Sequence, residues 1–183
     1  MIANCSFFEA GCDIIPLVNE GDANTDITGD WVKMVNYTRC LLLIAKYGTE
    51  DVDTLGFQVY QATSAAGGSA KGVSALFPYW YKQGTLTSQT VWTSGQLTTA
   101  DDILGVGSAA PTGGTLVVAT DTNTDAFLLA IDVQVTDLDM DNGFDWLTVQ
   151  IEGDEVNNTV LISAWAILSG GRFPQKTPLS AIS

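Results

Sequence analysis

An acidic run at residues 137–145 holds the side chains whose types and spacing come closest to a recognisable chemistry. Alternating carboxylates can direct several oxygens at one hard cation such as Ca²⁺. The candidate ligands are Asp137, Asp139, Asp141 and Asp145. An EF-hand loop beginning at the first of these would require glycine and glutamate where this chain has Asn142 and Thr148. A solvated acidic turn between two strands explains the run more simply, and weak calcium binding is the alternative hypothesis.

Other catalytic chemistry finds little support in the residue types. The chain of 183 residues contains no histidine, which excludes Ser/His/Asp and Cys/His nucleophiles and the HExxH zinc site. Phosphate-cradling motifs such as GxxxxGK[ST] are also missing from the sequence. Many carboxylates are present, but no spacing selects an acid and a nucleophile for glycoside hydrolysis. The sequence therefore predicts a protein that is not an enzyme, with no catalytic residue and no cofactor.

The charge distribution limits the possible partners. The formal net charge is −14, and between Lys82 and Arg172 there are twelve acidic residues and no basic one. Such a surface repels nucleic acid and anionic lipid, because it lacks cations that could displace the counterions of phosphate. We expect neither as a partner. The acid excess serves solubility, or it complements a basic partner.

The cysteines and the N-terminal residues indicate a reducing compartment. Cys5, Cys12 and Cys40 are odd in number and lack CxxC spacing, which argues against a disulfide framework or a zinc site. Cys40 lies in an apolar run and is expected to be a buried, inert thiol.

Residues 1–10 lack the basic start of a signal peptide, and no apolar run reaches the roughly 20 residues that cross a bilayer. We therefore expect no secretion and no membrane span.

Two-residue alternation of apolar and polar side chains recurs throughout the chain and predicts antiparallel sheet. The predicted strands are residues 13–18, 31–35, 39–47, 57–62, 79–82, 90–93, 115–120, 131–136, 147–152 and 160–168. This number of short strands favours an all-β, two-layer antiparallel β-sandwich of jelly-roll type, with a Greek-key barrel as the alternative.

Two further expectations concern strand placement. Asn142-Gly143 lies between strands 131–136 and 147–152 and is a strong turn signal, so we expect these strands to be neighbours. The runs at residues 40–45 and 160–168 are apolar on both faces, so each is expected in the centre of a sheet, between two layers.

Aromatic residues gather at residues 77–81, and further tryptophans are scattered along the chain. An exposed aromatic row could stack on sugar rings, as in carbohydrate-binding modules. Buried packing is the commoner use of Trp and Tyr in a two-layer sheet, and we favour it here.

The chain divides into a body and two terminal segments. Residues 1–28 are expected to form an N-terminal arm or first strand, residues 29–170 the sandwich body, and residues 171–183 an extended C-terminal arm. Pro174 and Pro178 favour extended structure in this arm.

Several blocks of sequence together resemble a known group of proteins. They are Gly29-Asp30-Trp31-Val32, Asn36-Tyr37, residues 61–71, Asn142-Gly-Phe-Asp-Trp146 and the stretch from Arg172 to Ile182. Over residues 29–182 the chain resembles capsid decoration, or cement, proteins of tailed bacteriophages that have a β-sandwich body.

The resemblance implies a structural role on the virion. Such a protein is made in the host cytoplasm, binds the outer capsid surface and stabilises the head by bridging neighbouring major capsid subunits, commonly as a homotrimer. The residues then expected at intersubunit or capsid contacts are Phe7, Phe8, Arg172, Phe173, Lys176, Leu179 and Ile182. The alternative is that the C-terminal arm covers an edge of its own sheet. An alternative function is that of a tail- or head-associated β-sandwich module that binds a receptor or carbohydrate.

Overall fold

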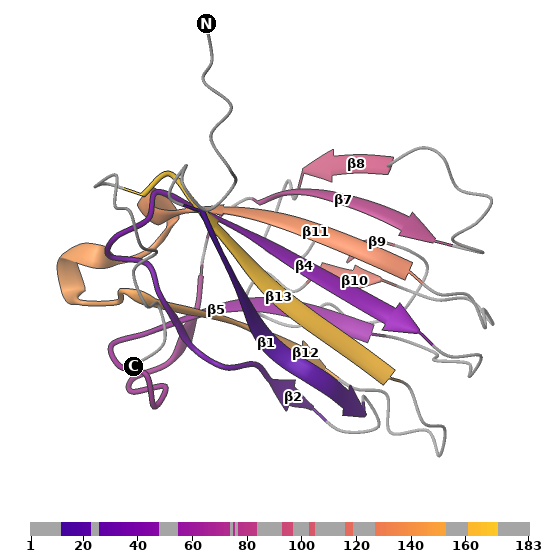
Figure 1. The fold of residues 1–183 in the computed structure, drawn as a ribbon, viewed down its shortest axis with the longest axis horizontal. Coiled ribbons are helices and arrows are strands. Elements are labelled where there is room, and N and C mark those ends of the chain that lie inside the picture. Colours follow the sequence, from indigo (N-terminus) through magenta and orange to yellow (C-terminus); the bar gives the residue numbers. More distant parts are fainter. Residues whose placement is uncertain are drawn as a thin grey trace, which may run out of the picture.

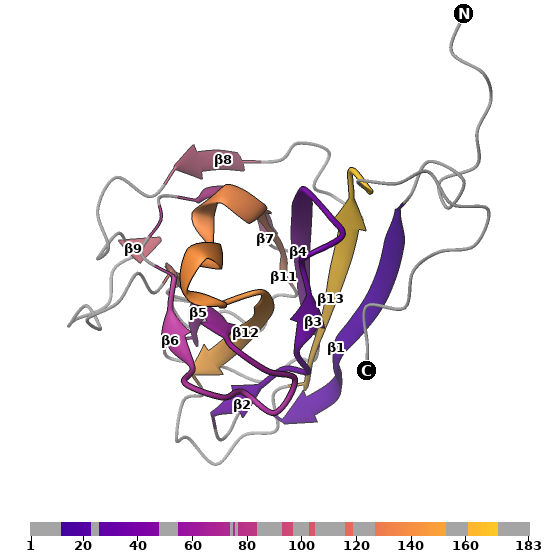
Figure 2. The same cartoon turned by 90° about the vertical axis from the view of Figure 1, so that its left-hand side faces the viewer.

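The structure is a computed structural model in which the described elements are strands and two short 3₁₀ turns. It describes residues 12–22, 26–47, 55–73, 75, 77–83, 93–96, 103–104, 116–118, 127–152 and 161–171. Two sheets pack face to face (Figures 1 and 2). The predicted all-β, two-layer sandwich is therefore confirmed. Among these residues, no helix is long and apolar enough to span a membrane.

The first sheet has six strands and contains both ends of the described chain. Its order is β1 (Asp13–Asp22), β13 (Leu161–Ser169), β4 (Arg39–Tyr47), β11 (Phe127–Gln134), β7 (Pro78–Gln83) and β8 (Thr93–Gln96). All five pairings within it are antiparallel. Because β1 belongs to this sheet, residues 13–22 form a first strand, which is one of the two roles expected for residues 1–28.

The second sheet has seven strands. Its main order is β2 (Ile27–Thr28), β12 (Trp146–Glu152), β5 (Leu55–Ala62), β10 (Leu116–Val118) and β9 (Ile103–Leu104). Two short strands complete it, β3 (Val32–Lys33) beside β12 and β6 (Lys71–Gly72) beside β5. Its pairs are antiparallel except for β9 with β10. Every strand predicted from the sequence overlaps an observed one, whereas the two-residue strands β2, β6 and β9 were not predicted.

The strand pairs are nested along the chain. The innermost pair is β7 with β8, followed outward by β5 with β10, β4 with β11, β2 with β12 and β1 with β13. Successive pairs alternate between the two sheets. The chain therefore resembles one long hairpin that is wound around a common core.

The core lies between the sheets and follows from the alternation in the sequence. Leu42 and Ile44 of β4 are fully buried, as are Leu147, Val149 and Ile151 of β12. They belong to one continuous cluster of apolar side chains. Burying a side chain of this size contributes about 1.5–3 kcal/mol, so this layer accounts for much of the stability of the sandwich.

The expected pairing of strands 131–136 and 147–152 is wrong. β11 lies in the six-stranded sheet and β12 in the seven-stranded sheet. The chain between them forms two 3₁₀ turns, η1 (Val135–Asp137) and η2 (Met140–Asn142), at one end of the sandwich (Figure 2). Gly143, with φ of 81°, ends η2. The Asn-Gly signal therefore marks a turn that crosses between sheets rather than a hairpin.

The two runs that are apolar on both faces are adjacent in the six-stranded sheet. β4 and β13 pair along their whole length in its interior, as expected from the sequence. Their inner faces contact the core. On their outer faces, no element of the described chain forms a second layer, as Figure 1 shows from that side. The expectation of a layer on each side is therefore met on one side only.

Candidate interaction surface

The outer face of the six-stranded sheet is apolar across five strands. On β4 and β13, partly exposed apolar residues alternate with the buried residues of the core. The strand registers align these side chains in two rows. One row is Pro16, Trp165, Leu43, Ala130 and Trp80, and the other is Ile14, Ile167 and Leu41. We call these two rows the apolar sheet face.

Such a face is unusual on an antiparallel sheet that borders solvent. The outward side of a two-layer sandwich is generally polar, and large contiguous apolar patches mark interaction sites. Ile14 is 47% exposed, and the other members of the two rows are exposed or half-buried, apart from Ala130. The apolar sheet face is therefore a candidate contact surface for protein.

The other sheet has a different outer face. There Gln150 pairs with Gln58, and Thr148 pairs with Tyr60. Gln58 Nε2 donates to Glu152 Oε1 at 3.0 Å. Gln58 and Thr148 are buried, and Thr148 Oγ1 donates to the Gly29 carbonyl oxygen at 2.8 Å. The outward side chains of the second sheet are therefore more polar than the two rows of the apolar sheet face.

An ion pair lies in the second row of the apolar sheet face, where Asp132 is the partner of Leu41. Arg39 Nη2 donates to Asp132 Oδ2 at 2.6 Å, and Arg39 Nε donates to Asp132 Oδ1 at 2.5 Å. These hydrogen bonds raise the pKa of Arg39, with the carboxylate charge as a further cause. The two charges cancel locally, so the face presents little net charge to a partner.

The edge of this sheet beside β1 is protected against strand addition. The register of β1 with β13 shifts between Pro16 and Val18 and again between Val18 and Gly21. Bulges and proline are two devices by which proteins protect exposed sheet edges. Contact with a partner is therefore better suited to the face of the sheet than to this edge.

Both terminal segments join the body at one corner of the apolar sheet face. Asp13, near the start of the described chain, pairs with Leu168, near its end. Beyond β13, Gly170 has a φ of 67°, and a Cβ atom at this position would lie 1.9 Å from Thr38 Oγ1. The close packing of Thr38 against this glycine fixes the point at which the C-terminal segment leaves the sheet.

The contact residues expected from the resemblance belong to these two segments. They are Phe7, Phe8, Arg172, Phe173, Lys176, Leu179 and Ile182. All seven lie outside the described residues, so their roles stay predictions. The structure adds that the two segments carrying them join the body at neighbouring strand ends.

The four carboxylates considered for calcium have separate surroundings. Asp137 Oδ2 accepts a hydrogen bond from the backbone N–H of Gln134 at 2.8 Å. Asp139 Oδ2 is 2.6 Å from Lys71 Nζ, and Asp145 Oδ2 is 3.6 Å from Lys33 Nζ. The fourth carboxylate, Asp141, is exposed. Within the part of the chain that the structure describes, no three His, Cys, Asp or Glu residues are grouped to hold a metal ion. The structure therefore gives the calcium hypothesis no support.

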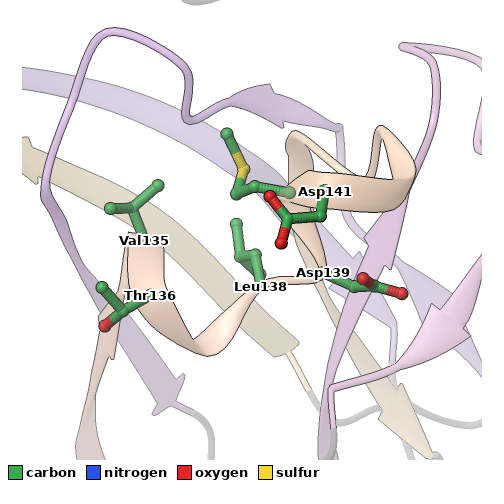
Figure 3. A pocket seen from close by; sticks show the side chains of 6 residues that line it. Val135, Thr136, Leu138, Asp139 and Asp141 are labelled. Atoms are coloured by element: carbon green, nitrogen blue, oxygen red, sulfur yellow. The ribbon is translucent and has the colours of Figure 1, made fainter.

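The 3₁₀ turns border a shallow cavity of about 410 Å³ (Figure 3). It is lined by Val135, Thr136, Leu138, Asp139, Met140 and Asp141. The Lys71 ammonium, which lies 2.6 Å from the carboxylate of Asp139, is also 3.9 Å from the centre of the Phe144 ring. The hydrogen bond from this ammonium, followed by one from Asn142, lowers the pKa of Asp139. The cavity thus combines apolar side chains with an anionic group.

The aromatic side chains are divided between core and surface. Phe77 and Trp146 are buried, and Tyr79 and Tyr81 pack against the core. Trp80 and Trp165 instead point to the outer side of the six-stranded sheet. The expectation of buried packing is therefore correct for the first group, whereas these two tryptophans are half-buried on the outer side. The signal that could have found Trp165 is the alternation within the run at residues 160–168, which is apolar on both faces.

The thiols agree with the sequence interpretation where they are described. Cys40 is buried, and burial raises the pKa of its thiol. Cys12 is half-buried, and both are free. Burial also raises the pKa of Cys12. Neither environment activates a thiolate.

Comparison with protein-family models and with curated proteins gives no match to this chain. The apolar sheet face is therefore interpreted from its own residues.

Proposed function

We propose that this protein is a structural component of a tailed-bacteriophage virion. It binds the outer surface of the capsid and stabilises the shell by bridging neighbouring major capsid subunits. The observation that carries the proposal is the apolar sheet face, together with the two terminal segments that join the body at its corner. This arrangement suits lasting contact with protein surfaces, and no part of the proposed role requires catalysis or a cofactor.

The dimensions of the face support a stable contact. Six strands about 4.8 Å apart span roughly 24 Å, and nine residues of β4 span about 30 Å, so the whole outer face of this sheet measures about 700 Å². A standard protein–protein interface covers about 800 Å² on each partner. The apolar sheet face is part of this area, and the whole outer face together with one terminal segment is of adequate size for specific association.

The order of the strands favours the expected jelly-roll type over its alternative, a Greek-key barrel. A jelly roll can be described as one long hairpin wound around a core. This winding produces strand pairs that are nested along the chain and alternate between two sheets. Jelly rolls occur in viral capsid proteins and in lectins. Because a fold by itself does not give a function, this order supports the proposal only in combination with the apolar sheet face.

Charge and multivalency also fit the role. A net charge of −14 would attract basic patches on capsid subunits from a distance, and salt would weaken that attraction. We propose a homotrimer as the bound form. Three modest contacts on one trimer then act together through their effective concentration.

The cavity beside the 3₁₀ turns favours the second candidate function, carbohydrate binding. Apolar side chains and the carboxylates of Asp139 and Asp141 line it, and sugars present both apolar faces and hydroxyl donors to such groups. A tail- or head-associated module would use this cavity instead of the apolar sheet face. Binding to a glycan array that Asp141→Ala abolishes would favour this alternative.

Binding to expanded heads that lack the protein tests the first candidate. The informative variants are Trp165→Ser, on the apolar sheet face, and Gln150→Ser, on the polar outer face of the other sheet. We expect saturable co-sedimentation of the wild-type protein, reduced at least tenfold in affinity by the first variant and unchanged by the second. Melting curves establish that both variants are folded. Equal binding by both folded variants would refute the role of the apolar sheet face.

A further inference from the structure

We infer that residues 172–183 of the chain dock on the apolar sheet face, packing their apolar side chains against its two rows. This goes beyond the proposed function, since it assigns an occupant to the face in the free protein, which a capsid subunit that binds the face would displace. Four observations carry it: the uncovered face, the exit point of the segment, its composition and its charge.

The composition of the segment complements the face. Phe173, Leu179 and Ile182 supply three large apolar side chains within twelve residues. Among the described residues, no strand or turn covers the two rows on their outward side. Covering Trp165 and Leu43 with these side chains would remove apolar area from water on both partners.

The charge of the segment is opposite to that of the body. Arg172 and Lys176 give residues 172–183 a charge of +2 with no acidic residue, which leaves −16 on the remainder of the chain. Two of the seven basic residues therefore lie in this segment. At the corner where it leaves, Asp13 is the partner of Leu168 in the ladder. Arg172 follows Leu168 by four residues, so an extended chain places it within about 13 Å of that corner.

The prolines select the face rather than an edge as the docking place. A segment that extended the sheet at its edge would use its backbone N–H groups, and Pro174 and Pro178 have none. The exposed edge at β1 is also bulged. Docking by side chains on the face avoids both obstacles. This distinguishes the inference from the earlier alternative in which the arm covers a sheet edge.

The segment is long enough to cover the face. Twelve residues in extended, proline-rich conformation span about 37 Å, whereas the nine residues of β13 span about 30 Å. Gly170, in the left-handed region, and Gly171 allow the chain to reverse direction directly after the strand. Phe173 is then within reach of Ile167 and Leu41, the row nearest to the exit.

Site-specific photo-cross-linking in the full chain tests the inference. Benzoylphenylalanine replaces Leu179, and the cross-linked peptides are mapped by mass spectrometry. We expect attachment to β4, β11 and β13, with loss of most of this attachment when Leu43→Asp is added as the matched control. Attachment mainly to β5 or β12, or attachment that Leu43→Asp leaves unchanged in a folded protein, would overturn the inference.

A second measurement leaves the face itself unaltered. The variant Phe173→Ser/Leu179→Ser/Ile182→Ser should uncover the apolar sheet face and raise the fluorescence of a hydrophobic dye several-fold. Unchanged dye fluorescence, with a melting curve like that of the wild-type protein, would contradict docking. Mixing ¹⁴N and ¹⁵N protein before cross-linking identifies the origin of the segment. We expect cross-links within one copy, and cross-links mainly between copies would contradict docking of the segment on its own body. Neither measurement involves heads, so failure here is separate from failure of capsid binding.

Discussion

Arg39 and Asp132 form a two-point ion pair across β4 and β11, on the outer side of the six-stranded sheet. The Arg39 Nη2 to Asp132 Oδ2 distance is 2.6 Å. The Asp132 carboxylate is almost fully buried, whereas the Arg39 side chain is 55% exposed. The pair allows a carboxylate to lie beside Leu41 in the second row of the apolar sheet face.

The ion pair predicts asymmetric effects of its two single substitutions on stability. Arg39→Ala leaves a buried carboxylate without its main partner and should lower the free energy of unfolding by about 1–3 kcal/mol. The double variant Arg39→Ala/Asp132→Ala should lose less free energy of unfolding than the two single variants lose together, because it removes the orphaned charge as well. Urea unfolding of the four proteins measures this coupling. Strict additivity would contradict the role given to the pair.

Two glycines with positive φ, Gly143 and Gly170, provide a matched test of the packing of Gly170 against Thr38 just beyond β13. Gly143→Ala adds a Cβ with no atom within 4 Å, so it should cost only about 1 kcal/mol of backbone strain. Gly170→Ala adds the same strain together with a clash against Thr38 Oγ1. We expect the second substitution to cost more stability and to change the position of residues 172–183. Comparable melting temperatures for the two variants would contradict this packing.

The Lys71–Asp139 pair predicts a pH-dependent contribution to stability. Hydrogen bonds from Lys71 and Asn142 lower the pKa of Asp139 in the folded state. The contribution should therefore be complete above the unfolded value of about 3.9 and disappear as the pH falls through the lower folded value. The stability difference between wild-type protein and Lys71→Met, measured by urea unfolding at several pH values, should follow this course. A difference that grows on acidification would refute it.

Glu152 predicts the opposite pH dependence. Burial, followed by the charge of Asp26, raises its pKa in the folded state. Ionisation of Glu152 is then unfavourable in the fold, so stability is lost as the pH rises through the raised folded value. Glu152→Gln removes that charge and retains an acceptor for Gln58 Nε2. We expect the variant to be more stable than wild type near pH 7 and no more stable below about pH 4, as measured by thermal unfolding. Destabilisation by this substitution at neutral pH would show that the charge is favourable.

Strand positions could be predicted from the sequence because alternation is a local property. The alternation of residues 39–47 and 147–152 corresponds directly to β4 and β12. The assignment of strands to sheets could not be predicted in the same way. Asn142-Gly143 indicates a turn, but pairing between distant strands decides that β11 and β12 lie in different sheets.

The candidate surface was only partly visible in the sequence. The doubly apolar runs of β4 and β13 indicated that both faces of the sheet seek apolar contact. Sequence alone does not tell whether the outer face is covered by another layer of the same sandwich. The Arg39–Asp132 pair was also hidden, because its members are 93 residues apart and are brought together only by the sheet.

The thermal stability of expanded heads, with and without the added protein and across ionic strengths from roughly 0.05 to 0.5 M, tests the proposed role most directly. The account predicts saturable binding that raises the temperature at which the heads disassemble. It also predicts that the rise shrinks as salt screens the attraction to the acidic body. Heads that melt at the same temperature at every salt concentration, in the presence of folded and soluble protein, would contradict a role in stabilising the capsid.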